Sequence, residues 1–516
     1  MSNVQKRSSQ QAELHSKLWT MANDLRGNMN AEEFKNYILG VLFYRFLSDK
    51  LEKEINSMLE IDGLTYEEAW EDEEYREDIK EEVLEDLGYI IEPKYLFSNM
   101  IELIKNNEFD VEVLATALTL FNESIMGTKN QEAFENLFED LDVNSSKLGR
   151  TVRERSLLIG KILITISTID ISHDDAEIDV LGDAYEYLIG QFAANSGRKA
   201  GEFYTESQCA KLMAKIATHD RNRIESVFDC ACGSGSLLLQ VNKEVEVAHI
   251  YGQEKNSTTY NLARMNMLLH GRNYQNFHIK NCDTLTDPYF RDILFDVQVL
   301  NPPYSLKNWQ DNPAILLEDE RFSAYGKLAP NSKADFAFVQ HTIHHMKDDG
   351  IGVVLLPHGV LFRGAAEKTI RKHIIEKQNV LDAVIGLPPK LFYATDIPVV
   401  ILVLKKNREN TDNILFIDAS KYFEPGKNQN RLREEDIDRI MSAYIERRDI
   451  DKFAHVASME EIKENDYNLN IPRYVDTFEK EEPIDIEAVF EDINTNNENL
   501  MKIDKELMNY FKELGL

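Results

Sequence analysis

The chain has 516 residues, of which 43% are hydrophobic, and its formal net charge at pH 7 is −32. This length predicts more than one domain, and the apolar content is enough for sizeable cores. The composition excludes a membrane span, because the best apolar run, Ile38 to Leu47, is short and contains Arg45, so it reads as a buried amphipathic helix. The N-terminus is polar and carries no secretion signal, so we expect a cytoplasmic protein.

The first 170 residues have the periodicity of helices. Phe34, Ile38, Leu42 and Phe46 recur on one helical face, and strand signals are few. We therefore predict an N-terminal helical domain over residues 1–170. Acidic residues gather in places such as Tyr66 to Glu74, and we expect solvated helix faces there rather than catalytic carboxylates.

Residues 171–425 alternate helical patterns with short apolar strands, for example Val297 to Leu300 and Ile351 to Leu356. This alternation predicts an α/β fold, a doubly wound, mainly parallel, Rossmann-like sheet that binds its ligand at the carboxyl ends of the strands. The late run Pro398 to Leu404 suits a hairpin that ends such a sheet.

A glycine-rich turn follows the first strand of this region. Val227 to Asp229 reads as the end of a buried strand, Cys230 to Ser236 as the turn, and Leu237 to Gln240 as the start of a helix. Such a turn allows close backbone approach, and the helix start offers free N–H groups. The Gly-Ser-Gly sequence lacks the third glycine of the dinucleotide fingerprint, so by itself it is a weak signal.

Two further strand-like runs end in polar residues. The first ends at Glu254, near the place where doubly wound folds hold a ribose. The second leads to Asp283, whose carboxylate could accept a hydrogen bond from an adenine amino group.

The next strand-like run, Phe295 to Leu300, leads directly into Asn301-Pro302-Pro303-Tyr304. An amine attached to adenine is a poor nucleophile, because its lone pair is delocalised into the ring, so both of its N–H groups need acceptors as attack begins. The side-chain carbonyl of Asn301 can serve one and the backbone carbonyl of Pro302 the other, while Tyr304 stacks on the base. The competing interpretation of the motif alone is an ordinary turn with two prolines.

Four cysteines, at positions 209, 230, 232 and 282, have neither disulfide-framework nor zinc spacing. We predict no metal site, and we expect Cys230 and Cys232 to pack under the glycine turn.

From residue 426 to 516 we predict a helical region that contacts a partner subunit. Its tail has apolar residues at amphipathic spacing, namely Ile486, Val489, Ile493, Leu500, Ile503, Leu507 and Tyr510. The alternative is a helix folded back on its own domain.

With these motifs the chain resembles the N6-adenine DNA methyltransferases, and more closely the modification subunits of type I restriction-modification systems. The resemblance covers nearly the whole chain, and it includes the stretches Gly201 to Thr205, Ala334 to Phe338, Leu356 to Gly364 and Tyr467 to Tyr474. Glu206 and Cys230 stand where relatives usually have proline, so the resemblance assigns no pocket contacts to these two positions.

The resemblance implies S-adenosylmethionine as cofactor and residue roles to match. It implies catalysis by Asn301, Pro302, Pro303 and Tyr304. It implies a cofactor pocket lined by Glu202, Phe203, Tyr204 and Thr205, with the methionine moiety beside Asp229, Gly233, Ser234, Gly235 and Ser236, the ribose on Glu254 and the cofactor adenine near Asp283. The target adenine would be flipped out of the duplex and held by Tyr304 and a second aromatic, Phe362 or Phe322.

The charge of −32 is awkward for a DNA enzyme, because duplex affinity comes largely from Lys and Arg. No basic stripe or recognition helix is evident, and we therefore predict that another polypeptide recognises the DNA target sequence. The resemblance likewise implies DNA, a specificity subunit and a restriction subunit as partners, with two copies of this chain per specificity subunit. The rival hypotheses are a methyltransferase for a protein glutamine or an RNA base, and a non-catalytic scaffold.

Overall fold

The computed structural model describes residues 19, 29, 31–169, 180–195, 205–392, 397–426, 429–477 and 486–515. The chain divides into two compact units, Met1–Val475 and Asp476–Leu516. No helix among the described residues combines the length and the apolar character that a membrane crossing requires.

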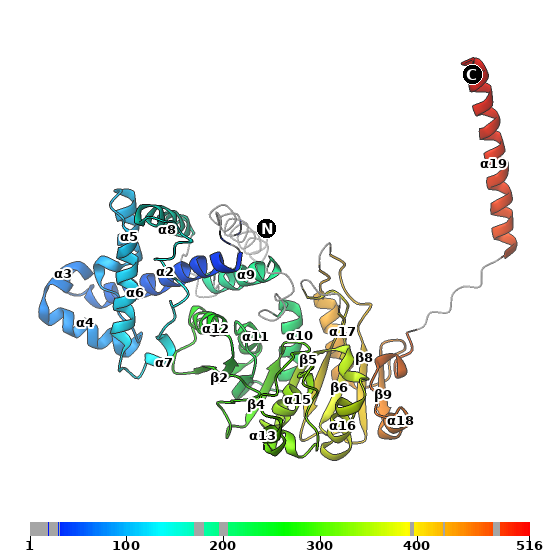
Figure 1. Cartoon of the computed structure of the whole chain (residues 1–516). Helices are drawn as coiled ribbons and strands as arrows, with labels where there is room; N and C mark the ends of the chain where they lie inside the picture. Colours follow the sequence, from blue (N-terminus) through cyan, green and yellow to red (C-terminus); the bar gives the residue numbers. More distant parts are fainter. Residues whose placement is uncertain are drawn as a thin grey trace. The chain divides into compact units, whose positions relative to one another are not determined.

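The N-terminal part of the first unit is helical (Figure 1). Capping boxes start two of its helices, because Thr65 and Thr151 each accept a backbone N–H while a glutamate three residues later reaches back. The helices of its described residues are α2 (Ala31–Leu59), α3 (Tyr66–Glu71), α4 (Glu73–Asp86), α5 (Phe97–Lys105), α6 (Val111–Ile125), α7 (Gln131–Phe134) and α8 (Val152–Ser167), with the short η1 (Pro93–Tyr95).

The apolar run Ile38 to Leu47 lies inside α2, and most of it is buried, which confirms the buried helix predicted there. Its one cation has a structural use. Arg45 donates hydrogen bonds to the carbonyl oxygens of Ile166, in the last turn of α8, and of Ile169, two residues beyond the end of that helix.

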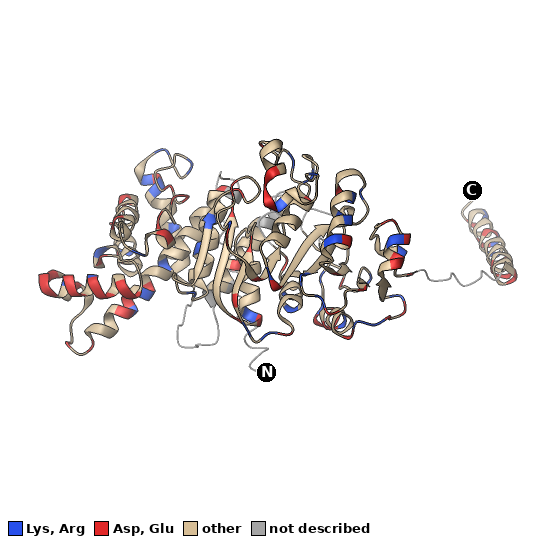
Figure 2. Ribbon diagram, turned by 90° about the horizontal axis from the view of Figure 1, so that it is seen from below, with Lys and Arg blue, Asp and Glu red and all other residues tan. Residues whose placement is uncertain are grey.

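Acidic residues crowd α3 and α4, whose Asp and Glu are red in Figure 2. Twelve acidic and two basic residues lie between Tyr66 and Asp86. The acids from Glu67 to Glu74 are exposed, which confirms the prediction of solvated helix faces.

Nine strands of the described residues form one sheet in the order β3-β2-β1-β4-β5-β7-β6-β8-β9. The strands are β1 (Arg223–Asp229), β2 (Glu246–Glu254), β3 (Phe277–Asn281), β4 (Phe295–Leu300), β5 (Met346–Pro357), β6 (Leu381–Gly386), β7 (Val399–Lys405), β8 (Asn413–Asp418) and β9 (Ala454–Ser458).

Strands β3, β2, β1, β4 and β5 pair in parallel, so their carboxyl ends meet at one edge. β7 runs antiparallel between β5 and β6 and forms the hairpin predicted at Pro398 to Leu404. The predicted α/β class with a doubly wound, mainly parallel sheet is therefore confirmed.

The sheet continues beyond residue 426. There β9 pairs antiparallel with β8, which itself runs parallel to β6. The prediction of helix alone after Lys427 is wrong at this strand. Five residues are too few for an alternating pattern to stand out, and it is the open edge of β8 that makes Ala454–Ser458 extended.

Two apolar cores cover the two faces of the sheet, and neighbouring residues of β1 and β4 belong to different cores. The first core holds residues of α9 (Val180–Asn195), α10 (Ser207–Thr218), α11 (Ser236–Glu244), α12 (Ser257–Leu269) and α17 (Glu434–Glu446). The second holds residues of α13 (Pro313–Glu318), α14 (Glu320–Ser323), α15 (Asp335–His344), α16 (Ala365–His373), α18 (Met459–Glu464), η3 (His358–Leu361), η4 (Ile374–Gln378) and η5 (Ile471–Arg473).

A buried arginine joins the helical domain to the sheet domain. Arg264 of α12 is 1% exposed and donates hydrogen bonds to the carbonyl oxygens of Glu132 and Glu135, at distances of 3.0 and 2.9 Å. Its guanidinium also lies over the ring of Tyr260, 4.2 Å from the centroid. A buried charge paired in this way holds the helical domain against one face of the sheet.

In the second unit the described residues form α19 (Ile486–Glu513), and none of them is buried. The apolar residues predicted to form one face are all exposed, including Ile493, Leu500 and Leu507.

Candidate active site

The two predicted turns leave the same edge of the sheet. β1 ends at Asp229 and β4 at Leu300, and these parallel neighbours are in register at Val227 with Val297 and at Phe228 with Gln298. Neighbouring strands lie about 4.8 Å apart, so the glycine turn and the Asn-Pro-Pro-Tyr turn start side by side.

Asn301 presents a buried acceptor. Its Nδ2 donates a hydrogen bond to Oγ1 of Thr205, at 3.1 Å, and Thr205 is 8% exposed. The Oδ1 atom of Asn301 is buried and has no hydrogen-bond partner among the described residues. Because a buried polar atom without a partner is costly, this oxygen is suited to accept a hydrogen bond from a ligand.

The rest of the turn is enclosed. Pro302 is buried, while Pro303 and Tyr304 are half-buried. The hydroxyl oxygen of Tyr304 is also buried without a partner in the described part of the chain. Burial holds the pKa of Tyr304 well above its usual value, and Cys209 and Asp335 raise it further, so this hydroxyl stays neutral.

The glycine turn needs glycine for backbone reasons. Gly233 and Gly235 have φ values of 55° and 78°, in the left-handed region. Gly235 caps the start of α11, and a Cβ built there would lie 2.7 Å from Cε of Met267. The hydroxyls of Ser234 and Ser236 hydrogen-bond to each other at 3.0 Å. The turn thus offers backbone N–H groups and hydroxyls at the start of a helix.

Two carboxyls lie beside this turn. Asp229 is 2% exposed and accepts a hydrogen bond from the N–H of Ala231 at 2.9 Å. Burial, opposed by that hydrogen bond, raises the pKa of Asp229 to about 8. Glu254 accepts from the N–H groups of Gly233 at 3.1 Å and Asn256 at 2.7 Å, and burial raises its pKa too.

Asp283 is engaged by other partners. Its Oδ2 pairs with Nζ of Lys255 at 2.7 Å, and its Oδ1 accepts from the N–H of Leu285 at 3.0 Å. A hydrogen bond from an adenine amino group would have to share this carboxylate with Lys255.

Three of the expected pocket residues, Glu202, Phe203 and Tyr204, lie outside the described residues.

The two positions that depart from the family pattern, Glu206 and Cys230, have local roles in the structure. Glu206 caps α10, because its carboxylate accepts from the N–H of Cys209 at 2.9 Å. Cys230 is buried, and its carbonyl oxygen accepts from the hydroxyl of Thr284.

The two aromatic residues that the sequence offers for stacking on the second face of a flipped base differ in exposure. Phe322 is fully buried in the second core, whereas Phe362 is 49% exposed. Only Phe362 of these two is therefore accessible to a ligand without rearrangement of the core.

Sequence reasoning missed a contact behind the Asn-Pro-Pro-Tyr turn. Asp335, which is fully buried, accepts a hydrogen bond from the N–H of Ser305 at 2.8 Å and pairs with Arg363 at 3.0 Å. Asp335 and Arg363 both lie in sequence stretches on which the family resemblance rests. Those stretches could have drawn attention to the two residues, but they indicate no role for either.

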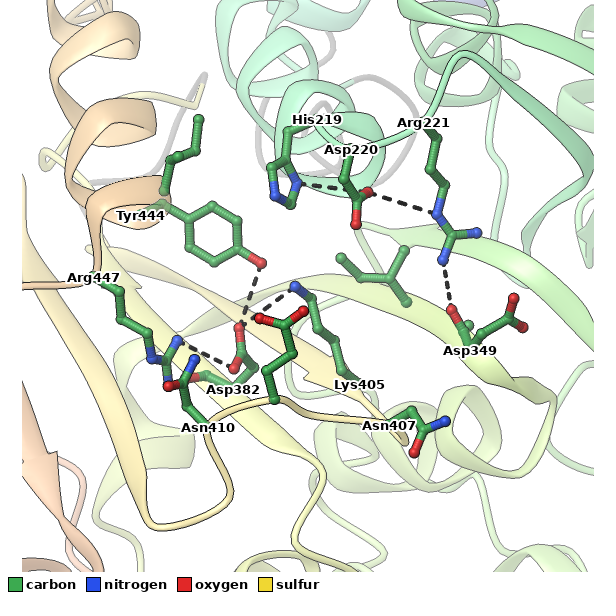
Figure 3. A pocket seen from close by; sticks show the side chains of 14 residues that line it. His219, Asp220, Arg221, Asp349, Asp382, Lys405, Asn407, Asn410, Tyr444 and Arg447 are labelled. Carbon is green, nitrogen blue, oxygen red and sulfur yellow. Dashed lines mark hydrogen bonds and ion pairs between the residues drawn. The ribbon is translucent and has the colours of Figure 1, made fainter.

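A separate pocket of about 340 Å³ lies at the opposite edge of the sheet (Figure 3). Tyr444, Lys405 and Arg447 converge there on Asp382, near the start of β6. Ligands of doubly wound folds bind at the carboxyl ends of the strands, so we place the active site at the edge with the two turns.

Comparisons with known proteins agree with this fold. The family model described as N-6 DNA Methylase matches residues 176–483, and the HsdM N-terminal domain model matches residues 14–165. The first of these models matches more than half of the chain. Together with a sheet of this strand order and both turns at one edge, this match shows that the chain is a DNA methyltransferase.

Relatives narrow the class. The chain is 37% identical to the type I restriction enzyme MpnII methylase subunit of Mycoplasma pneumoniae, over 99% of this chain and 97% of that protein. It is 32% identical to the MjaVIII methylase subunit of Methanocaldococcus jannaschii, over 93% of this chain and 81% of the relative. The crystal structure of the type I restriction-modification methyltransferase subunit from Streptococcus thermophilus has 45% identity and a TM-score of 0.84, covering 91% of this chain and 100% of that one. The chain belongs to the N-6 DNA methylase family, among the methyltransferase subunits of type I restriction-modification systems.

Proposed function

We propose that this chain transfers a methyl group from S-adenosylmethionine to the N6 amine of adenine at specific DNA sites. The observation that carries the proposal is the buried Oδ1 of Asn301, which has no hydrogen-bond partner in the part of the chain that the structure describes; the amide nitrogen of this side chain donates to Thr205. An oxygen acceptor fixed at that place matches the N–H of a planar amine.

The chain's own residues would position the amine rather than deprotonate it. Asn301 and the carbonyl of Pro302 accept the two N–H groups, which makes the nitrogen lone pair more available. Tyr304 holds the flipped base by stacking, and Phe362 is the accessible candidate for the other face. No strong base is needed, because the amine becomes acidic only as the new bond forms and its proton then leaves to water or through Asn301. Orientation and hydrogen bonding do most of the catalysis.

The residues of the glycine turn fit S-adenosylmethionine, which when bound supplies an electrophilic methyl group on a sulfonium. Gly233 and Gly235 let the backbone come close, and Ser234 and Ser236 add hydroxyls at the start of α11. Glu254, half-buried and with acceptor capacity beyond its two backbone bonds, would hold the ribose hydroxyls. Asp229 would face the cationic amino group of the methionine moiety, and Asp283 would lie near the cofactor adenine. We also propose that Glu202, Phe203, Tyr204 and Thr205 line this pocket.

We further propose that the chain works in a complex, in the cytoplasm where its DNA substrate is found. A specificity subunit would supply sequence recognition, a restriction subunit would join, and two copies of this chain would bind one specificity subunit. The net charge of −32 supports a separate DNA-reading partner.

The exposed helix α19 supports contact with such a partner. Ile486, Ile493, Leu500, Leu507 and Leu514 recur every seven residues, and each is at least 49% exposed. Val489, Ile503 and Tyr510 fall between them at the second apolar position of the heptad. An unburied seam of this kind is the pattern of a helix that packs against another helix.

Methyl-transfer assays test the proposal. With tritiated S-adenosylmethionine, the complex should label DNA at N6 of adenine, whereas RNA and protein should stay unlabelled. Asn301→Ala should lower the turnover number by about 10²- to 10³-fold, the usual loss when one preorganised hydrogen-bond partner is removed, while cofactor affinity measured by calorimetry persists. Full activity of that variant, or label in RNA or protein alone, would refute the assignment.

A further inference from the structure

A fully buried carboxylate ties the Asn-Pro-Pro-Tyr turn to the segment that follows β5. Asp335, the first residue of α15, is 0% exposed. Its Oδ1 accepts the N–H of Ser305 at 2.8 Å, and its Oδ2 pairs with Nη1 of Arg363 at 3.0 Å. The same nitrogen of Arg363 also reaches Oε1 of Glu367 at 3.0 Å, and Glu367 is 2% exposed.

The turn needs this support, because its backbone is strained immediately after Tyr304. Ser305 has a φ of 53°, in the left-handed region that costs a residue other than glycine about 1–2 kcal/mol. Two more contacts link the same segments: the N–H of Ala334 donates to the carbonyl of Leu306 at 3.1 Å, and Nζ of Lys333 lies 3.4 Å from Oγ of Ser305.

Neighbouring residues also hold Arg363, the partner of Asp335. The guanidinium of Arg363 folds back over Gly359, where a Cβ would lie 2.3 Å from its Nε. Arg371, which is buried, donates to the carbonyl oxygens of Val360 and Arg363 at 3.0 and 3.1 Å. Arg363 is thus held by packing against Gly359 and by the hydrogen bond to its own backbone carbonyl, and it in turn pairs with Asp335.

None of these side chains is among the groups that would touch the cofactor or the base. We propose that Asp335 and Arg363 are positioning residues for the methyl transfer: together they hold the strained turn so that Asn301 and Tyr304 meet the amine in reactive geometry. This inference rests on the proposed function. A displacement of about 1 Å at a reacting centre costs on the order of 100-fold in rate, so the expected effect falls on turnover and not on cofactor binding.

Asp335→Asn is the sharpest test, because it keeps the size and the Oδ1 acceptor for Ser305 while removing the charge that pairs with Arg363. We expect the turnover number to fall by about 10- to 100-fold, with the affinities for S-adenosylmethionine and DNA changed less than about threefold. Arg363→Lys should retain more turnover than Arg363→Gln, because it keeps the cation.

The chain offers a matched control at the far edge of the sheet. Asp296 likewise accepts a backbone N–H, from Ser226 at 2.9 Å, and pairs with Lys347 at 3.0 Å. Asp296→Asn makes the same chemical change away from the turn and should leave the turnover number unchanged. Its melting temperature should be similar to that of Asp335→Asn.

Turnover, ligand affinity and melting temperature of these variants together decide the proposal. A selective loss of turnover in Asp335→Asn supports the positioning role. Unchanged turnover, or a loss of turnover, affinity and melting temperature together, overturns it. If Asp335→Asn does not fold, equal turnover in the lysine and glutamine variants of Arg363 overturns the role, and a lysine advantage supports it. Absence of methyl transfer to DNA by the unsubstituted complex would instead be a failure of the proposed function.

Discussion

Cofactor affinity should depend on pH through Asp229. This carboxyl is 2% exposed, and burial raises its pKa to about 8, so in the free protein it is mostly protonated at neutral pH. A cationic amino group beside it would favour the carboxylate. Binding below pH 8 must then expel a proton, and affinity rises with pH until the carboxyl is ionised in the free protein as well.

The size of the effect follows from that pKa. If the ionised form alone binds, the dissociation constant scales with one plus the ratio of protonated to ionised carboxyl, which predicts about 20-fold tighter binding at pH 7.5 than at pH 6. An α-amino group with its usual pKa of about 7.7 to 8.0 is still mostly protonated at pH 7.5, and its partial deprotonation there lowers the expected gain in affinity to about 15- to 20-fold.

Isothermal titration calorimetry measures both quantities. Titrations of S-adenosylmethionine in buffers of different ionisation enthalpy should show about one proton released per cofactor at pH 6. Asp229→Asn should bind more weakly and with little dependence on pH. Equal affinities at pH 6 and 7.5 in the unsubstituted protein, or the same slope in the asparagine variant, would refute the reasoning.

Three further substitutions test other parts of the site. Gly235→Ala places a side chain at φ 78°, at a cost of about 1–2 kcal/mol, and should weaken cofactor binding about tenfold or more in calorimetry. Tyr304→Phe should keep most methyl transfer, because stacking is retained and the lost hydroxyl has no partner in the described structure, whereas Tyr304→Ala should abolish transfer without loss of cofactor binding. Leu500→Glu with Leu507→Glu should release the chain from the specificity subunit in size-exclusion chromatography, because charge enters the apolar seam of α19.

Matched variants elsewhere in the chain provide controls for the glycine and the leucine substitutions. Gly271→Ala introduces the same kind of strain, at φ 68° with no atom of the described residues within 4 Å of the new Cβ, and should leave cofactor affinity intact. Asn494→Glu with Asn509→Glu adds the same charge to α19 outside the seam and should preserve the complex. Equal effects of Gly235→Ala and Gly271→Ala on affinity, full transfer by Tyr304→Ala, or a complex that survives the leucine variants would each contradict its prediction.

The sequence alone determined the class of fold and the two turns. Alternation of short apolar strands with helices is a local pattern, and Asn301 to Tyr304 and Gly233 to Gly235 each follow a strand within a few residues. Parallel strands put such turns at a common edge, so their meeting could be predicted without coordinates. The heptad spacing of α19 is likewise visible in the sequence.

Tertiary structure decided what depends on pairing across long separations. β9 is extended because β8 presents an open edge, a cause that lies 36 residues or more earlier in the chain. Asp335 and Arg363 are 28 residues apart, and both are remote from Ser305, so no spacing rule joins them. The partnering of Asn301 with Thr205, the raised pKa of Asp229 and the choice between Phe322 and Phe362 all follow from burial, which arises only when distant segments pack together.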